Sequence, residues 1–230
     1  MARNALGALE VTVYPGLVPF SDAWREQQAR GRALENLTER RAQLMLLEHA
    51  SVYTLGRMTQ PAHVSTEATA SGDPAALLRA RTKAEVLPIE RGGSVTYHGP
   101  GQQMAYLQLN LKSWALEIHR HLWNLEEAAI RTLAAFGLRG ERIEGQTGVW
   151  CEHAGAPAKV CAIGVTARRW VTYHGLCLNV DLDFAPFALI DPCGLGRKPV
   201  TSLAALLGRR VTLNEVHVPL QGAFRGVLGV

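Results

Sequence analysis

The chain has 230 residues, of which 47% are hydrophobic and 19% are charged, so it is long enough to bury one substantial core. No stretch approaches the roughly 18 charge-free apolar residues of a membrane-spanning helix, and the first residues lack the apolar run of a signal peptide. Composition therefore argues against an integral membrane protein built from helices. We expect one domain over residues 1–230, located in the cytoplasm and without a membrane partner.

The first third of the chain predicts two strands and a helix. Residues 9–14 alternate enough for a strand, and Ser21 is a candidate N-cap for a long polar helix that runs to about Thr38. The apolar run at 44–47, inside the segment 41–53, indicates a buried central strand. Residues 59–81 are rich in Ala, Thr, Ser, Gly and Pro, which predicts a surface excursion.

The remainder of the chain mixes strand and helix patterns. Strands are expected at 85–89, 94–98, 104–109, 148–151, 160–165 and 176–180. Helices are expected at 116–136, 184–188, 202–207 and 214–227, and Gly137 is a typical residue to end the first of these. Because the order lacks a strict βαβ rhythm, the pattern favours an α+β fold with a mixed, largely antiparallel sheet.

A glycine-rich segment over residues 91–102 is the densest unusual feature of the sequence. It places four glycines and one proline among polar residues. Glycines packed this tightly let backbone N–H groups approach a ligand closely, but an ordinary pair of hairpin turns has the same composition. Both interpretations remain open on composition alone.

Four cysteines are present, and their spacing forms no C-x-x-C zinc or redox motif. Cys193 lies between Pro192 and Gly194, a context that predicts an exposed tight turn where its sulfur can reach a substrate. Cys161 and Cys177 lie in apolar runs and are expected in the core, as is Cys151 beside a tryptophan.

A nucleophilic thiol needs a partner that takes its proton, and the candidates are Lys159, His98 and His174. Lys159 stands out because it is the only lysine between Lys112 and Lys198 and precedes an apolar strand pattern. A lysine that extends from a strand end to solvent gives the same pattern. Each histidine alone is more often a hydrogen-bonded structural residue than a base.

Basic residues are paired at 168–169, 197–198 and 209–210, which explains part of the net charge of +4. Such pairs are usually solvated surface, although they can also attract an acidic partner. The aromatic residues are not interleaved with basic ones, so the sequence gives little support for a nucleic-acid-binding module.

Four motifs follow one another along the chain. They are the glycine-rich segment with Thr96-Tyr97-His98-Gly99-Pro100-Gly101-Gln102, then Lys159-Val160-Cys161-Ala162-Ile163-Gly164, then His174-Gly175-Leu176-Cys177-Leu178-Asn179, and last Pro192-Cys193-Gly194. In this order they resemble the octanoyl-[acyl carrier protein]:protein N-octanoyltransferase family. The segments 46–49, 53–57 and 200–203 are also similar to that family, so the likeness extends from about residue 9 to 225.

The resemblance implies a fold shared with biotin and lipoate protein ligases, an α+β domain around a curved mixed sheet flanked by helices. It implies that Cys193 is the acyl-thioester nucleophile and Lys159 its catalytic partner. The residues that it implies for the acyl and acceptor-lysine site are Arg91, Gly92, Gly93, Ser94, Val95, Thr96, Tyr97, His98, Ala162, Ile163, Gly164, Gly175, Leu176 and Cys177. The sequence departs from the family at Cys161 and Cys177, where alanine is frequent, and at Ala50, where proline is common.

The reaction that the resemblance implies moves an octanoyl group from octanoyl-acyl carrier protein to a lysine of a lipoyl domain. The expected acceptors are the lipoyl domains of 2-oxoacid dehydrogenase E2 subunits and the glycine cleavage H protein. No metal and no cofactor is expected, because the acyl group arrives as a phosphopantetheine thioester. Three alternatives are an ATP-dependent lipoate or biotin protein ligase, a cysteine hydrolase that uses His98 or His174 as base, and a non-enzymatic binding module.

Overall fold

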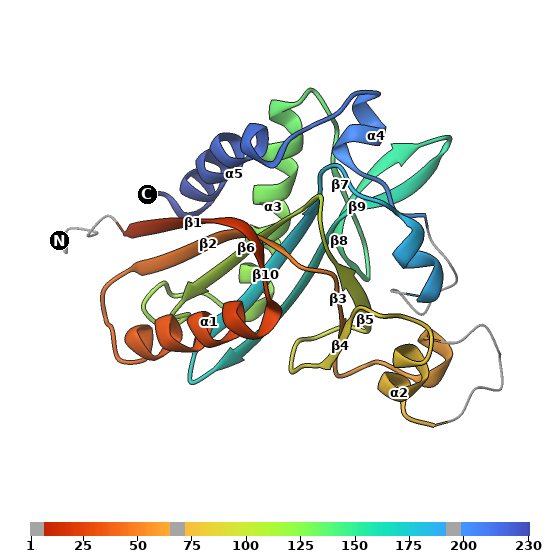
Figure 1. The fold of residues 1–230 in the computed structure, drawn as a ribbon. Coiled ribbons are helices and arrows are strands. Elements are labelled where there is room, and N and C mark those ends of the chain that lie inside the picture. The colour runs from red at the N-terminus through yellow and green to blue at the C-terminus, as the bar shows by residue number, and fades with distance from the viewer. Residues whose placement is uncertain (1–6, 65–71, 192–198) are drawn as a thin grey trace.

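The computed structural model describes residues 7–64, 72–191 and 199–230, and its main feature is a seven-stranded sheet (Figure 1). Only the pair of strands at one edge, β1 and β2, is parallel, and the other neighbours are antiparallel. The strands follow the order β1 (Ala8–Val18), β2 (Arg41–His49), β6 (Gln102–Leu109), β10 (Val171–Asn179), β9 (Ala156–Arg168), β8 (Gln146–His153) and β7 (Glu141–Ile143).

Helices cover both faces of this sheet (Figure 1). One face packs on α1 (Phe20–Leu34), and the opposite face packs on α3 (Ile118–Ala135) and α5 (Leu213–Leu228). All residues of the central strands β6 and β10 are consequently buried, which explains why their sequences lack alternation of polar and apolar residues. The last helix is well delimited, because Thr212 and Glu215 form a capping box and Gly229 ends it with a φ of 72°.

A small second sheet lies beside the first and has its own apolar cluster. It contains β3 (Val52–Leu55) between β4 (Glu85–Pro88) and β5 (Val95–His98). Buried side chains of this cluster, among them Tyr53 and Leu78, join the small sheet to α2 (Pro74–Arg79). The remaining described helices are short and comprise η1 (Pro61–His63), η2 (Ala185–Leu189) and α4 (Leu203–Leu207).

The predicted α+β class with a mixed, largely antiparallel sheet is confirmed. Gly137 follows α3 in the left-handed conformation, with a φ of 74°, as its position predicted. The assignment of residues 1–230 to one domain stays a prediction.

Several expected boundaries were wrong. Ser21 is not an N-cap, because the helix begins at Phe20 directly after Pro19, and it ends at Leu34 rather than near Thr38. Proline fits this position because its missing N–H would have no helical partner. By contrast, the buried strand expected at 44–47 is confirmed as part of β2, which ends at His49 before the chain enters the small sheet at Val52.

Two short elements were missed in the sequence. The excursion at 59–81 contains α2, whose N-cap Asp73 accepts hydrogen bonds from the N–H groups of Ala75 and Ala76. The edge strand β7 has only three residues, too few for a periodic pattern. Within the part of the chain that the structure describes, no helix combines the length and the hydropathy needed to cross a membrane.

His121, on the sheet-facing side of α3, predicts an acid-sensitive fold. The side chain is fully buried, neither ring nitrogen forms a hydrogen bond with the described residues, and burial lowers its pKa to about 4. The ordinary pKa is about 6.5, so the unfolded state binds the proton first and stability falls as the pH drops from 6.5 towards 4. Between pH 7 and pH 5 this one group costs about 2 kcal/mol of unfolding free energy.

Between pH 7 and pH 5, we expect the unfolding free energy of His121→Leu to fall by about 2 kcal/mol less than that of the parent chain. Urea unfolding at pH 7 and pH 5 measures the difference. An identical pH dependence of the two proteins would show that this histidine titrates normally in the fold.

Candidate active site

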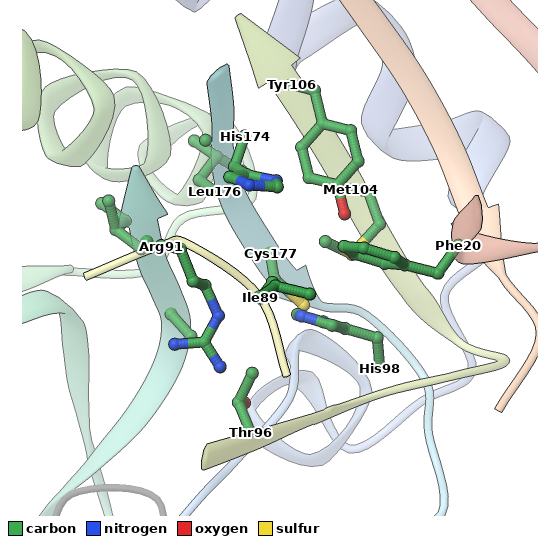
Figure 2. Close-up of a pocket in the computed structure, with 14 residues that line it drawn as sticks. Phe20, Ile89, Arg91, Thr96, His98, Met104, Tyr106, His174, Leu176 and Cys177 are labelled. Atoms are coloured by element: carbon green, nitrogen blue, oxygen red, sulfur yellow. The ribbon is translucent and has the colours of Figure 1, made fainter. Parts of the chain in front are cut away.

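A cavity lies between the large sheet, the small sheet and the beginning of α1 (Figure 2). The strands that form it meet at β10, which pairs with β6 on one side and β9 on the other. Nine of the site residues implied by the sequence line it: Arg91, Thr96, His98, Ala162, Ile163, Gly164, Gly175, Leu176 and Cys177.

Strand alternation explains which residues of the glycine-rich segment reach this cavity. Thr96 and His98 are two positions apart on β5 and line the cavity. Val95 and Tyr97 lie on the other face of the strand, in the apolar cluster of the small sheet. These two implied site residues therefore do not line the cavity, and the Tyr97 ring packs against Tyr53 at 5.1 Å between centroids.

The missing side chain of Gly175 allows the strands behind the cavity to approach closely. A Cβ atom at this position would lie 2.2 Å from the carbonyl oxygen of Ala105 on the neighbouring strand β6. Gly175 is also paired with Gly164 of β9. The two glycines thus leave room for the cavity at the point where three strands meet.

Arg91 places a buried positive charge in the cavity wall. Its guanidinium donates to the carbonyl oxygen and Oγ1 of Thr54 and to the carbonyl oxygen of Gly92, all neutral acceptors. No carboxylate of the described residues forms an ion pair with it, and burial lowers its pKa to about 10. The charge stays in place at neutral pH and can stabilise negative charge on a bound carbonyl oxygen.

Five residues that line the cavity are not among the site residues predicted from the sequence, although one of them, His174, was considered as a base. Phe20 begins α1, Met104 and Tyr106 come from β6, Ile89 follows β4, and His174 comes from β10. The alternating side chains of β6 all lie in a buried strand, so no local signal distinguishes those that reach a cavity. Figure 2 shows Phe20, Tyr106, His98 and His174 arranged around a common space.

The two histidines that were candidate bases are deeply buried. His98 is 6% exposed and His174 is 4% exposed. Burial, with smaller effects from nearby cationic groups, lowers the pKa of His98 well below 6.5 and that of His174 to about 3. Both imidazoles are therefore neutral at physiological pH. The described residues contain no group of three His, Cys, Asp or Glu side chains that could hold a metal ion.

Lys159 lies outside the cavity proper, next to its wall. It is half-buried on β9, its Nζ donates to the carbonyl oxygen of Thr147 at 3.2 Å, and it lies 4.6 Å from the centre of the Trp150 ring. It lines a second small cavity that shares Thr96 and Ala162 with the first. The strand begins earlier than expected, at Ala156, so Lys159 does not sit at its end.

An open groove meets Lys159 from the other side. Gly92, Gly93 and Ser94 line this groove rather than the enclosed cavity. The groove and the cavity share Ile163 and Gly164 of β9. Lys159 thus occupies the junction of an enclosed space and a solvent-open one, where a substrate can extend from one into the other.

Cys193 lies outside the described residues, in the segment 192–198, but the chain on both sides of this segment is anchored at the groove. The N–H of Asp191 donates to the carbonyl oxygen of His63, which lines the groove. On the other side, the backbone of Lys159 exchanges hydrogen bonds with Pro199 and Thr201, at 2.9 and 3.0 Å.

The other three cysteines are buried, as their sequence context predicted. Cys151, Cys161 and Cys177 are all less than 6% exposed. Burial raises the pKa of each thiol, to about 11 for Cys151 and further for the other two. They are poor nucleophiles at neutral pH.

Most of the paired basic residues are neutralised within the chain. In the two basic pairs that the structure describes, all four arginines form ion pairs: Arg168 with Glu90, Arg169 with Glu35, Arg209 with Glu215 and Arg210 with Asp181. Arg197 and Lys198 lie outside the described residues. Attraction of an acidic partner by the described pairs is weaker than their number in the sequence implies.

Comparison with known proteins assigns the family. Residues 22–225 match the family model of the lipoyl protein ligase A/B catalytic domain. The octanoyltransferase of Gloeobacter violaceus is 44% identical over 218 residues, which cover 95% of this chain and 90% of that protein. That of Rubrobacter xylanophilus is 40% identical, and the match covers 96% of this chain and 95% of the relative.

The chain belongs to the octanoyltransferase family. It is therefore an acyltransferase. Solved structures agree on the fold: a lipoate-protein ligase A bound with ATP has a TM-score of 0.71 at 18% identity, covering 98% of this chain and 86% of the ligase. The biotin protein ligase from Aquifex aeolicus has a TM-score of 0.51 at 11% identity, covering 96% and 69%.

The close approach at Gly175 gives a test of the cavity framework in this octanoyltransferase family member. We expect Gly175→Ala to lower the unfolding free energy by about 1–3 kcal/mol, because its Cβ meets a backbone atom that cannot move aside. Gly222→Ala is the matched control, since nothing lies within 4 Å of a Cβ there and alanine favours the helix by roughly 0.5–1 kcal/mol. Equal stability of Gly175→Ala and the parent chain would contradict the described strand spacing.

Proposed function

We propose that this chain transfers an octanoyl group from octanoyl-acyl carrier protein to a lysine of a lipoyl domain, through a thioester on Cys193. The acceptors are the lipoyl domains of 2-oxoacid dehydrogenase E2 subunits and the glycine cleavage H protein. Relatives that are at least 40% identical over nearly the full chain carry the name octanoyltransferase, which supports this acyl group. No cofactor takes part, because the donor thioester is already activated.

The observation that carries the proposal is the pair of hydrogen bonds between the backbone of Lys159 and residues 199 and 201. They hold the chain that leaves the Cys193 segment against the strand that carries the Lys159 amine. At the other end, Cys193 follows Asp191 by two residues, and two residues of extended chain span at most about 7 Å. Asp191 is bonded to His63 in the groove wall, and this anchor supports a thiol and an amine that meet in one groove.

The enclosed cavity supports a role as the acyl site. Ile89, Met104, Ile163 and Leu176 give it apolar walls, and it shares Thr96 and Ala162 with the space beside Lys159. Each methylene group buried there stabilises binding by about 0.8 kcal/mol, so an acyl chain shorter by two carbons binds roughly tenfold more weakly.

In the first half-reaction, the Cys193 thiol gives its proton to the Lys159 amine and its sulfur attacks the thioester carbonyl of the donor. The carbon–sulfur bond to phosphopantetheine breaks, and the leaving thiolate receives the proton from Lys159. In the second half-reaction, the amine of the acceptor lysine attacks the new thioester. Lys159 removes the proton that the amide must lose, and Cys193 leaves as the thiol once protonated.

Two enzymatic alternatives predict different behaviour. A lipoate or biotin protein ligase of the same fold requires ATP to activate a free acid, whereas a thioester converts to an amide without ATP. A cysteine hydrolase would use a histidine as base and water as acceptor. The burial and lowered pKa values of His98 and His174, together with their place in the cavity rather than beside the groove, disfavour that assignment.

Mixing the protein with octanoyl-acyl carrier protein, without acceptor and without ATP, tests the proposal by intact-mass measurement. We expect one octanoyl adduct that is labile to hydroxylamine, maps to Cys193 and is absent in Cys193→Ala. Lys159→Ala should form the adduct at least a hundredfold more slowly, because no other described amine lies in the groove.

Cys151→Ala is the matched control, because that thiol is buried and lines none of the described cavities or the groove. An adduct on another residue would exclude Cys193 as the nucleophile. Adduct formation at the parent rate in Lys159→Ala would remove the lysine from the mechanism.

A further inference from the structure

Two ring nitrogens in the acyl cavity are left without a hydrogen-bond partner among the described residues. They are Nδ1 of His98 and Nε2 of His174, both fully inaccessible to solvent. The two side chains are more than nine-tenths buried and line the same cavity. Figure 2 shows the two rings facing the space that Phe20 and Tyr106 also border. A buried polar atom without a partner is rare, since it costs free energy that a hydrogen bond would recover.

His174 lies away from Lys159, because it pairs with Val165 of β9, six positions along that strand from the lysine. The residues that the cavity shares with the space beside Lys159 are Thr96 and Ala162, which mark its mouth. His98 follows Thr96 by two positions on β5, so the two side chains lie on the same face of the strand. His174 is three residues before Cys177, which pairs with Ala162. The methyl end of an acyl chain that enters at the mouth therefore approaches polar atoms.

Both ring nitrogens of the neighbouring His49 are already satisfied, so this residue does not supply the missing partners. Nδ1 of His49 lies 2.7 Å from the carbonyl oxygen of Val18, so this nitrogen carries the proton. Nε2 of the same ring then accepts from the Tyr106 hydroxyl at 2.8 Å. This leaves the lone pairs of the Tyr106 oxygen available as a further acceptor at the cavity.

The backbone around His174 holds its ring in place. The residue has a φ of 63°, an unusual conformation for a side chain of this size, and its N–H donates to Oε1 of Gln27. The ring stacks on Trp24 with 4.9 Å between centroids. A conformation of this kind persists only where surrounding contacts maintain it, and such positions concentrate at ligand sites.

We propose that the inner end of the cavity recognises a hydrogen-bonding group at the far end of a medium-length acyl chain, through His98 Nδ1 and His174 Nε2. The inference rests on the proposed function and extends its substrate class to eight-carbon acyl groups that carry a terminal hydroxyl. A neutral imidazole has one donor and one acceptor nitrogen, and a hydroxyl can donate to one ring while it accepts from the other. A hydrocarbon terminus leaves both nitrogens unpaired.

Binding of free 8-hydroxyoctanoate and octanoate to the full chain, measured by titration calorimetry, tests the inference. An apolar cavity end would weaken binding of the hydroxylated acid at least tenfold, because its hydroxyl would lose water without gaining a partner. We expect 8-hydroxyoctanoate to bind within threefold of octanoate or more tightly. Binding that is at least tenfold weaker than that of octanoate, or undetectable at millimolar concentration, overturns the inference.

Two single variants, His98→Leu and His174→Leu, locate the effect. In each, the ratio of the two affinities should shift at least fivefold towards octanoate, and the ratio cancels any loss that both ligands share. Met104→Leu changes the shape of the same cavity without a polar group, so its ratio should stay at that of the parent chain. A ratio unchanged in both histidine variants would assign the binding to other atoms.

Calorimetry with free acids involves no acyl transfer, so the result is independent of Cys193. Absence of a Cys193 adduct with octanoyl-acyl carrier protein would contradict the proposed function. The ratio of the affinities for 8-hydroxyoctanoate and octanoate could still be measured. A Cys193 adduct together with tenfold weaker binding of the hydroxylated acid would contradict only the polar recognition.

Discussion

The pairing of Lys159 with the chain at residues 199–201 is the constraint on which the rest of the site depends. Two backbone hydrogen bonds, 2.9 and 3.0 Å long, hold this chain along the outer part of β9. They join the strand that carries Lys159 to the chain that follows the Cys193 segment. Because these bonds involve backbone atoms, they fix the position of the chain without using the lysine amine, which remains oriented by Thr147 and Trp150.

The shape of the cavity beside this pairing depends on two glycines and on the alternation of side chains along a strand. Glycines at 164 and 175 face each other across β9 and β10, and neither position leaves room for a side chain. The strand β5 then directs Thr96 and His98 inwards. The result is an enclosed space with apolar walls that also contains a buried guanidinium and two neutral imidazoles, the features on which the proposed discrimination of acyl length and polarity rests.

Much of this arrangement could be predicted from the sequence, because its motifs are local. The family was predicted from the resemblance of four ordered motifs, and the α+β class and the burial of Cys151, Cys161 and Cys177 from element order and apolar context. The change of sheet between β2 and β3 could not be predicted, since the stretch Glu48-His49-Ala50-Ser51 contains no Gly or Pro that would mark a turn. Phe20 and Tyr106 could not be assigned to the cavity, because their place there depends on how α1 and β6 meet the small sheet.

The central claim is that the Cys193 thiol reaches the Lys159 amine, and a short reagent that joins a thiol to an amine tests it most directly. Mapping by mass spectrometry should find a link between Cys193 and Lys159, since the account brings the two reactive atoms within about 3 Å of each other. The three other cysteines are buried and should remain unmodified. If the reagent modifies Cys193 but links it only to other amines, the two residues do not meet and the account of the site is wrong.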